Sequence, residues 1–209
     1  MIDLLSIGGI VLLILAFGLS IPHWLKRWRM ARAFSDLRRT LGSGEVESSL
    51  FGWPRFSGLF QGRPCQISFR TTLVYSTHGA ALGDLAACYR VRLTDSDCAL
   101  LVLEKPSFFS RWFKGSNGNA RTLTVGGDRW RLVGANQSEM LQLTSHPEVT
   151  RAIKQLSVCK MIRLDREWVE ALEVEVARTE LRADRFVSML TRLTHLAAAA
   201  EQFGAGGPR

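Results

Sequence analysis

The longest apolar run of the chain lies close to its beginning. From Leu4 to Ile21, eighteen successive residues carry no charge, and Leu, Ile, Val, Ala and Phe predominate. As a helix, this run would be about 27 Å long at about 1.5 Å per residue, which matches the hydrocarbon thickness of one bilayer. The pattern therefore predicts one N-terminal transmembrane helix.

The residues that flank this run predict its orientation. Asp3 is the only charged residue before it, whereas six of the eighteen residues after Ile21 are Lys or Arg. Under the positive-inside rule, the N terminus lies outside and the remainder of the chain lies in the cytoplasm. We therefore expect a single-pass protein of the cell inner membrane with a cytoplasmic C-terminal domain.

Two other interpretations of the run are weaker. A cleaved signal peptide would carry a basic segment before the run and an A-x-A-like site after it, and the chain has neither. A buried helix of a soluble protein seldom lacks a polar stripe over five turns. Neither alternative fits the pattern as well as a membrane anchor does.

A helical period continues beyond the run. From Trp24 to Leu41, apolar residues recur at helical spacing, and Lys and Arg fill the positions between them. This pattern predicts a basic amphipathic stalk that either lies on lipid headgroups or continues straight from the membrane, so residues 1–41 form anchor and stalk. Residues 42–49 are rich in Gly, Ser and Glu and predict a flexible linker.

Beyond the linker, strand patterns come first and helical patterns follow. We expect strands over 55–60, 65–73, 88–94, 99–103, 122–125, 130–133, 159–164 and 172–176. Helical spacing begins at Ser138, recurs over 147–156 and ends with a long helix over 182–203. This order predicts an α+β domain over residues 50–203 with an antiparallel sheet and C-terminal helices, followed by a disordered tail over 204–209.

The first four strands are expected to be neighbours in the sheet in their order along the chain. Arg90 and Arg92 alternate with apolar residues on the third of them, and we expect both on the wetter face of the sheet.

Composition and charge narrow the class of partner. The whole chain has 46% hydrophobic and 22% charged residues, a composition that is typical of folded proteins and supports a folded domain after the anchor. Of the net charge of +8, residues 1–40 carry +4, so the cations are concentrated next to the predicted membrane edge. Anionic lipid headgroups are the simplest partner of such a segment. We expect no nucleic-acid partner, because the rest of the chain is only mildly basic and contains no nucleic-acid-binding motif.

A second aromatic and basic segment lies between the predicted strands. It has four aromatic residues within six positions and is followed by a Gly- and Asn-rich stretch. We expect it to contact lipid or a membrane partner, and the alternative is that it covers the core at the end of a strand. The predicted partner or lipid contacts are therefore Trp24, Lys26, Arg27, Trp28, Arg29, Phe108, Phe109, Arg111, Trp112, Phe113 and Lys114.

No motif predicts a catalytic, cofactor-binding or metal-binding residue. The cysteines Cys65, Cys88, Cys98 and Cys159 form no CxxC pair, so we expect them to be reduced and buried. The loop from His78 to Asp84 lies near Cys88 in sequence, but nothing in the spacing brings an imidazole to the thiol. It also lacks the P-loop and dinucleotide-binding patterns.

Two further sets of residues could be considered for a site. His23 lies at the predicted membrane edge and is a weak candidate ligand for a pigment or metal. The carboxylates Glu167, Glu170, Glu173, Glu175 and Glu180 are expected to be solvated, because no second cluster of His or Asp accompanies them.

The sequence therefore predicts a non-enzymatic accessory or scaffolding subunit of a larger membrane complex, such as an electron-transfer, photosynthetic or transport assembly. Its partners would be integral-membrane subunits and anionic lipid headgroups. The alternatives are a membrane-tethered sensor or binding module for anionic lipid or another anionic ligand, and a membrane-tethered enzyme.

Overall fold

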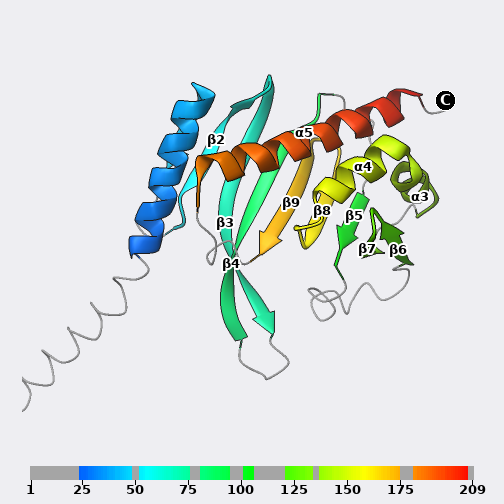
Figure 1. Ribbon diagram of the computed structural model, residues 1–209, viewed down its shortest axis with the longest axis horizontal. Coiled ribbons are helices and arrows are strands. Elements are labelled where there is room, and N and C mark those ends of the chain that lie inside the picture. Colours follow the sequence, from blue (N-terminus) through cyan, green and yellow to red (C-terminus); the bar gives the residue numbers. More distant parts are fainter. Residues whose placement is uncertain are drawn as a thin grey trace, which may run out of the picture.

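The computed structural model describes residues 24–48, 52–75, 81–94, 101–105, 121–133, 137–174 and 181–206. Within these ranges, nine strands form one antiparallel sheet in the order β1-β2-β3-β4-β9-β8-β5-β7-β6 (Figure 1). The strands are β1 (Glu45–Glu47), β2 (Arg55–Phe60), β3 (Arg63–Tyr75), β4 (Ala81–Arg92), β5 (Leu101–Glu104), β6 (Arg121–Val125), β7 (Asp128–Leu132), β8 (Met161–Leu164) and β9 (Trp168–Val174). The predicted α+β class with an antiparallel sheet is confirmed.

Two tight hairpins follow from the turn residues. Gln61 and Gly62 connect β2 to β3 with φ angles of 51° and 78°, and Gly126 and Gly127 connect β6 to β7 with 63° and 94°. Two successive positive φ angles are typical of the turns that match the twist of paired strands, and glycine adopts them without strain. The hairpins join strands that the sequence predicts, 55–60 with 65–73 and 122–125 with 130–133.

The centre of the sheet differs from the expected order. β4 pairs with β9 along the register from Ala86↔Val174 to Arg92↔Trp168, whereas β5 pairs with β8 and β7. The expectation that β5 follows β4 in the sheet is wrong. β9 has a run of five buried positions, which is typical of a central strand, and it carries the carboxylates that pair with residues of β4 and α5.

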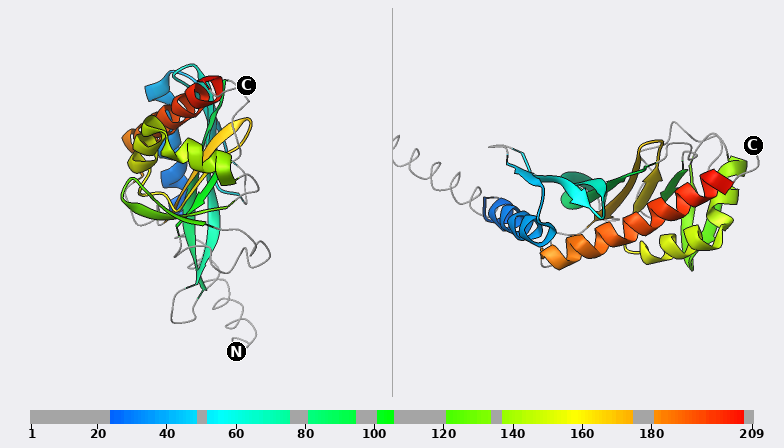
Figure 2. Two further views of the ribbon diagram at one scale, coloured as in Figure 1. Left: turned by 90° about the vertical axis from the view of Figure 1, so that its right-hand side faces the viewer. Right: turned by 90° about the horizontal axis from the view of Figure 1, so that it is seen from above.

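All helices of the described ranges lie on one face of the sheet (Figure 2). They are the helix of residues 24–41, α3 (Gln137–Ser145), α4 (Pro147–Gln155) and α5 (Ala183–Gly206). The predicted C-terminal helices are confirmed, and α5 crosses the sheet diagonally. The core lies between these helices and the sheet and includes the fully buried Phe186 and Trp130.

The predicted transmembrane run, residues 4–21, lies outside the described residues. No helix within the described ranges is both long enough and apolar enough to cross a bilayer.

Helix 24–41 belongs to the core of the domain. Its apolar stripe is buried from Met30 onward, and Phe34 is completely buried, with its ring 5.3 Å from that of Phe186 and 5.6 Å from that of Phe69. The stripe that we expected on lipid headgroups or along a free stalk therefore packs against the sheet and α5. Residues 45–47, within the predicted linker, form β1 and pair with β2.

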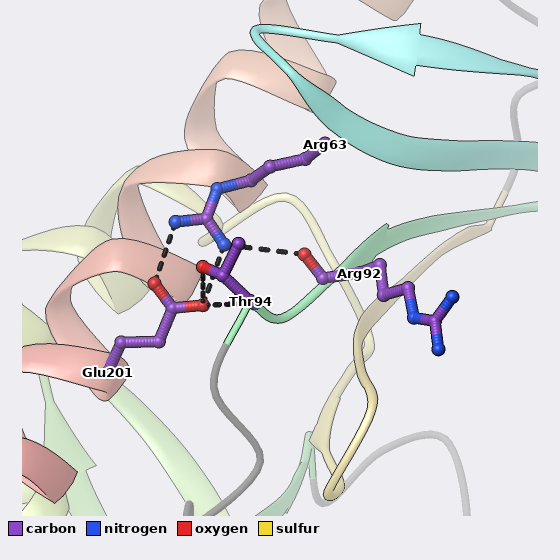
Figure 3. Close-up of polar contacts among 4 residues, drawn as sticks. All are labelled: Arg63, Arg92, Thr94 and Glu201. Carbon is purple, nitrogen blue, oxygen red and sulfur yellow. Dashed lines mark hydrogen bonds and ion pairs between the residues drawn. The ribbon is translucent and has the colours of Figure 1, made fainter.

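A polar cluster connects the end of α5 to the sheet (Figure 3). Arg63 donates two hydrogen bonds of 2.7 Å to the Glu201 carboxylate, and the backbone N–H and the hydroxyl of Thr94 donate to its Oε1 at 2.6 and 2.7 Å. Partial burial alone would raise the pKa of Glu201, but the hydrogen bonds from Arg63 and Thr94 outweigh it and lower the pKa to about 2.

This cluster predicts an acid-dependent loss of stability. Because the pKa of Glu201 is lower in the folded chain than its ordinary value of 4.5, the stabilisation is complete above pH 4.5 and is lost as the pH falls toward 2. The Glu201→Gln variant should lack this part of the pH dependence, which amounts to at most about 3 kcal/mol. Urea unfolding of the full chain in mild detergent at a series of pH values measures it.

The control is Glu148→Gln, which alters an exposed ion pair with Arg151 on α4. This variant should keep the acid dependence of the parent chain, since exposed pairs contribute little. Equal pH slopes for Glu201→Gln and the parent chain would show that the cluster does not stabilise the fold.

Candidate membrane-facing site

The first turns of helix 24–41 expose large apolar side chains. Trp24, Leu25 and Trp28 are 65%, 39% and 48% exposed, and within the described residues only Leu59 and Val158 join them as exposed large hydrophobic side chains. Tryptophan is the side chain most typical of a membrane interface, where its apolar ring and its N–H both find favourable surroundings.

The position of these residues follows from the helical repeat. Met30 is the first buried residue of the helix, and the buried stripe continues through Phe34 and Leu37. Trp24 and Trp28 precede this stripe and lie in the first described turns of the helix, which are dark blue in Figure 1. The beginning of the described helix is therefore exposed at the surface, and the part from Met30 onward is buried in the core.

The first described turns of the helix, residues 24–32 and here called the exposed turn, carry positively charged side chains and no acidic ones. Lys26, Arg27, Arg29 and Arg32 lie within it, and the guanidinium carbon of Arg32 is 5.6 Å from the centre of the Trp28 ring. The first acidic residue of the helix is Asp36, which pairs with Arg39 at 3.3 Å. A surface that combines tryptophan with several cations is complementary to anionic lipid headgroups, at about 1 kcal/mol for each cation near the membrane.

The predicted contact residues fall into two groups. Phe108, Phe109, Arg111, Trp112, Phe113 and Lys114 lie outside the described residues, as do His23 and His78. Trp24, Lys26, Arg27, Trp28 and Arg29 lie together on the exposed turn. Five of the eleven predicted contact residues thus lie in the first described turns of this helix, where Arg27 is half-buried and the other four are exposed.

Three of the four cysteines are buried, as expected, and Cys98 lies outside the described residues. Burial raises the pKa of Cys65 and Cys88 to about 11 and that of Cys159 to about 12, so these three thiols stay protonated at neutral pH. A protonated thiol is a poor nucleophile and a poor metal ligand. Within the described ranges, no three His, Cys, Asp or Glu side chains are arranged to hold a metal ion.

Two carboxylates that were expected to be solvated are buried. The side chains of Glu170 and Glu173 are 7% and 5% exposed. Glu170 forms an ion pair with Arg90 at 2.6 Å and accepts a hydrogen bond from the Arg90 Nε at 2.8 Å. Glu173 pairs with Arg185 and accepts a 3.1 Å hydrogen bond from the Tyr89 hydroxyl.

The expectation is therefore wrong for these two residues. They form structural ion pairs, because a buried carboxylate requires a partner charge. Burial and the nearby Glu173 charge raise the pKa of Tyr89, so its hydroxyl remains a donor. In the sequence, the alternation of Arg90 with apolar residues on β4 was the available sign that a charged partner was needed. Only the register between β4 and β9 identifies Glu170 as that partner.

A shallow groove of about 390 Å³ lies between α4 and α5. Its lining residues include Glu148, Arg151, His195 and Gln202, and Glu148 pairs with Arg151 at 2.9 Å. His195 is exposed, and the groove brings no nucleophile or buried acid to it.

Comparisons with known proteins give one likeness in fold. No protein-family model and no curated protein sequence matches the chain. Among solved structures, the crystal structure of the mycobacterial trehalose monomycolate transport factor A, TtfA, superposes with a TM-score of 0.58 at 10% sequence identity. The match covers 81% of this chain and 93% of that chain. At this identity the likeness concerns the fold alone.

Proposed function

We propose that this protein is a non-enzymatic, single-pass membrane protein and an accessory or scaffolding subunit of a larger membrane complex. Its N terminus would lie outside, and its α+β domain would lie on the cytoplasmic face of the cell inner membrane. The observation that carries the proposal is helix 24–41, which exposes Trp24 and Trp28 at one end and buries Phe34 in the core.

This helix would fix the domain relative to the membrane. A flexible linker would let the domain sample many orientations, whereas a continuous helix transmits the position of its first turn directly to the sheet. A domain held in this way stays at a constant distance from the membrane, although it can still rotate about the axis of the helix. Tethering also raises the effective concentration of the two partners, so that modest contacts suffice.

Among the kinds of complex considered, a transport assembly has some additional support. TtfA is described as a transport factor, and it shares the fold of this chain over most of both lengths. The likeness motivates testing transport complexes before electron-transfer or photosynthetic ones.

A membrane-tethered sensor or binding module for anionic lipid is the second candidate. It is favoured by Lys26, Arg27, Arg29 and Arg32, with no acidic residue between Trp24 and Asp36. Such a module would bind anionic vesicles without a protein partner, and its affinity would fall steeply with salt.

The decisive experiment is extraction of the full chain from native membranes with a mild detergent, followed by separation by size and identification of all comigrating proteins. A stable complex of constant stoichiometry is the expected result, and its companions would reveal the process served. Migration of the chain alone as a small particle would contradict the accessory-subunit proposal and favour the sensor.

The exposed turn gives a sharper prediction. The double variant Trp24→Glu and Trp28→Glu should lose the comigrating complex, because it places two negative charges where lipid or a membrane subunit is expected. Its free energy of unfolding should change by less than about 0.5 kcal/mol, since both side chains are exposed. Comigration and urea unfolding measure the two effects separately.

The matched control is Leu59→Glu. Leu59 is a large apolar side chain of similar exposure, 54%, but lies on β2 near the β2–β3 turn. This variant should retain the complex. Retention by the double tryptophan variant, with the chain still membrane-bound after an alkaline wash, would show that the turn is not the contact surface.

A further inference from the structure

A two-stranded ribbon extends beyond the rest of the sheet. β3 and β4 remain paired as far as Tyr75↔Ala81. In contrast, β2 pairs with β3 only as far as Ser68, and β9 pairs with β4 only from Ala86. Beyond those two positions, β3 and β4 have no neighbour except each other among the described strands.

The ribbon points to the side on which helix 24–41 begins. Figure 1 shows it running downward past the end of β9, and the first turns of the helix, in dark blue, also lie at its lower end. The left view of Figure 2 shows the same arrangement from a second direction. A membrane in contact with the exposed turn would therefore lie on the side toward which the ribbon extends.

The sequence of the ribbon changes along its length. Arg70, near the sheet, is exposed. Between Arg70 and Asp84 there are thirteen residues without an Asp, Glu, Lys or Arg. The outer apolar residues on the described strand backbone, here called the ribbon tip, are Leu73, Val74, Tyr75, Ala81 and Leu82. The charge-free part of the ribbon is thus the part farthest from the sheet.

Physical constraints indicate what this tip contacts. An isolated two-stranded ribbon is at best marginally stable in water, so an apolar, uncharged one needs a covering surface. The hydrocarbon core of a bilayer does not accept unpaired strand edges, because their backbone groups would lack hydrogen-bond partners. The boundary between headgroups and acyl chains satisfies both conditions, and tyrosine is enriched there.

We propose that the ribbon tip is a second membrane contact, which inserts into the headgroup–acyl boundary of an anionic bilayer. This inference rests on the proposed function, since it requires the domain to lie at a membrane. Together with the exposed turn of helix 24–41, the ribbon tip gives the domain two separate points of attachment to the membrane. Two points restrict rotation of the domain about helix 24–41, which a single anchor would leave free.

The test places a fluorophore on the tip. Val74→Cys and, as the control, Leu59→Cys are each prepared in the full chain with Cys98→Ser and labelled with an environment-sensitive dye. The native Cys65, Cys88 and Cys159 are buried and should not react. Each protein is reconstituted alone in vesicles of phosphatidylcholine and phosphatidylglycerol, and circular dichroism verifies that it is folded.

Two quenchers report the location of the dye. At Val74, quenching by a spin-labelled lipid should exceed that at Leu59 at least twofold, and quenching by aqueous iodide should be correspondingly weaker, with emission shifted to the blue. Equal iodide quenching at both positions would overturn the inference. Protection at Val74 in native membranes but not in vesicles would also overturn it, because the tip would then contact a protein.

The two proposals can fail separately. A ribbon tip in water on a chain that still comigrates with a membrane complex would refute only the second contact. A chain that washes off the vesicles and migrates alone would refute the proposed function and with it the premise of the second contact.

Discussion

Replacing Phe34 with alanine should lower the free energy of unfolding by about 3–5 kcal/mol. The ring is completely buried and lies within 6.0 Å of those of Phe56, Phe69 and Phe186, so its removal leaves a cavity where helix 24–41, the sheet and α5 meet. Since a domain of this size is stable by only about 5–15 kcal/mol, the loss is a large fraction of the total. Urea unfolding of the full chain in mild detergent, followed by tryptophan fluorescence, measures it.

The control is Arg38→Ala on the same helix. Arg38 is exposed, and the change should alter the free energy of unfolding by no more than about 0.5 kcal/mol. If Phe34→Ala unfolds at the same urea concentration as Arg38→Ala, the helix is not part of the domain core. The rigid connection between the exposed turn and the sheet would then have no basis.

Replacing Glu173 with alanine should lower the free energy of unfolding by about 3 kcal/mol or more. The change removes the carboxylate that pairs with the Arg185 guanidinium on α5 and accepts a hydrogen bond from the Tyr89 hydroxyl on β4. Arg185 is 30% exposed and can reach water, which places the expected loss at the lower end of the range for buried ion pairs. Glu173→Gln should lose less, since an amide oxygen still accepts from Tyr89.

The matched control is Glu167→Ala, a change at an exposed carboxylate in the turn before β9. It should leave the urea midpoint nearly unchanged. The double variant Glu173→Leu with Arg185→Leu should recover part of the loss, because an apolar pair removes the unpaired charge. Equal midpoints for Glu173→Ala and Glu167→Ala would show that the ion pair does not stabilise the fold.

Local features of the fold were predictable from the sequence. The β2–β3 and β6–β7 hairpins follow from short turns with Gly62 and with Gly126 and Gly127, where positive φ angles are needed. α5 follows from a single apolar stripe that includes Phe186 and Leu193. In each case the residues that determine the element are near one another in the chain.

Features that depend on distant residues were not predictable. The sequence gives no local sign that β9, rather than β5, lies beside β4, and the burial of Glu170 and Glu173 depends on that pairing. An apolar stripe on a basic helix is equally compatible with lipid and with protein. Only the fold shows that Met30 and Phe34 pack against the sheet while Trp24 does not.

Contacts between residues that are far apart in the chain determine when the domain can fold. Arg63 and Glu201, which hold the last turns of α5 on the sheet, are 138 residues apart. At a synthesis rate of about 5–20 residues per second, the ribosome needs on the order of ten seconds to produce the second residue after the first. During this interval the surface that receives α5 is open, and loop closure over such separations is slow. Folding of the domain is therefore a late event of translation, completed only when the final helix emerges.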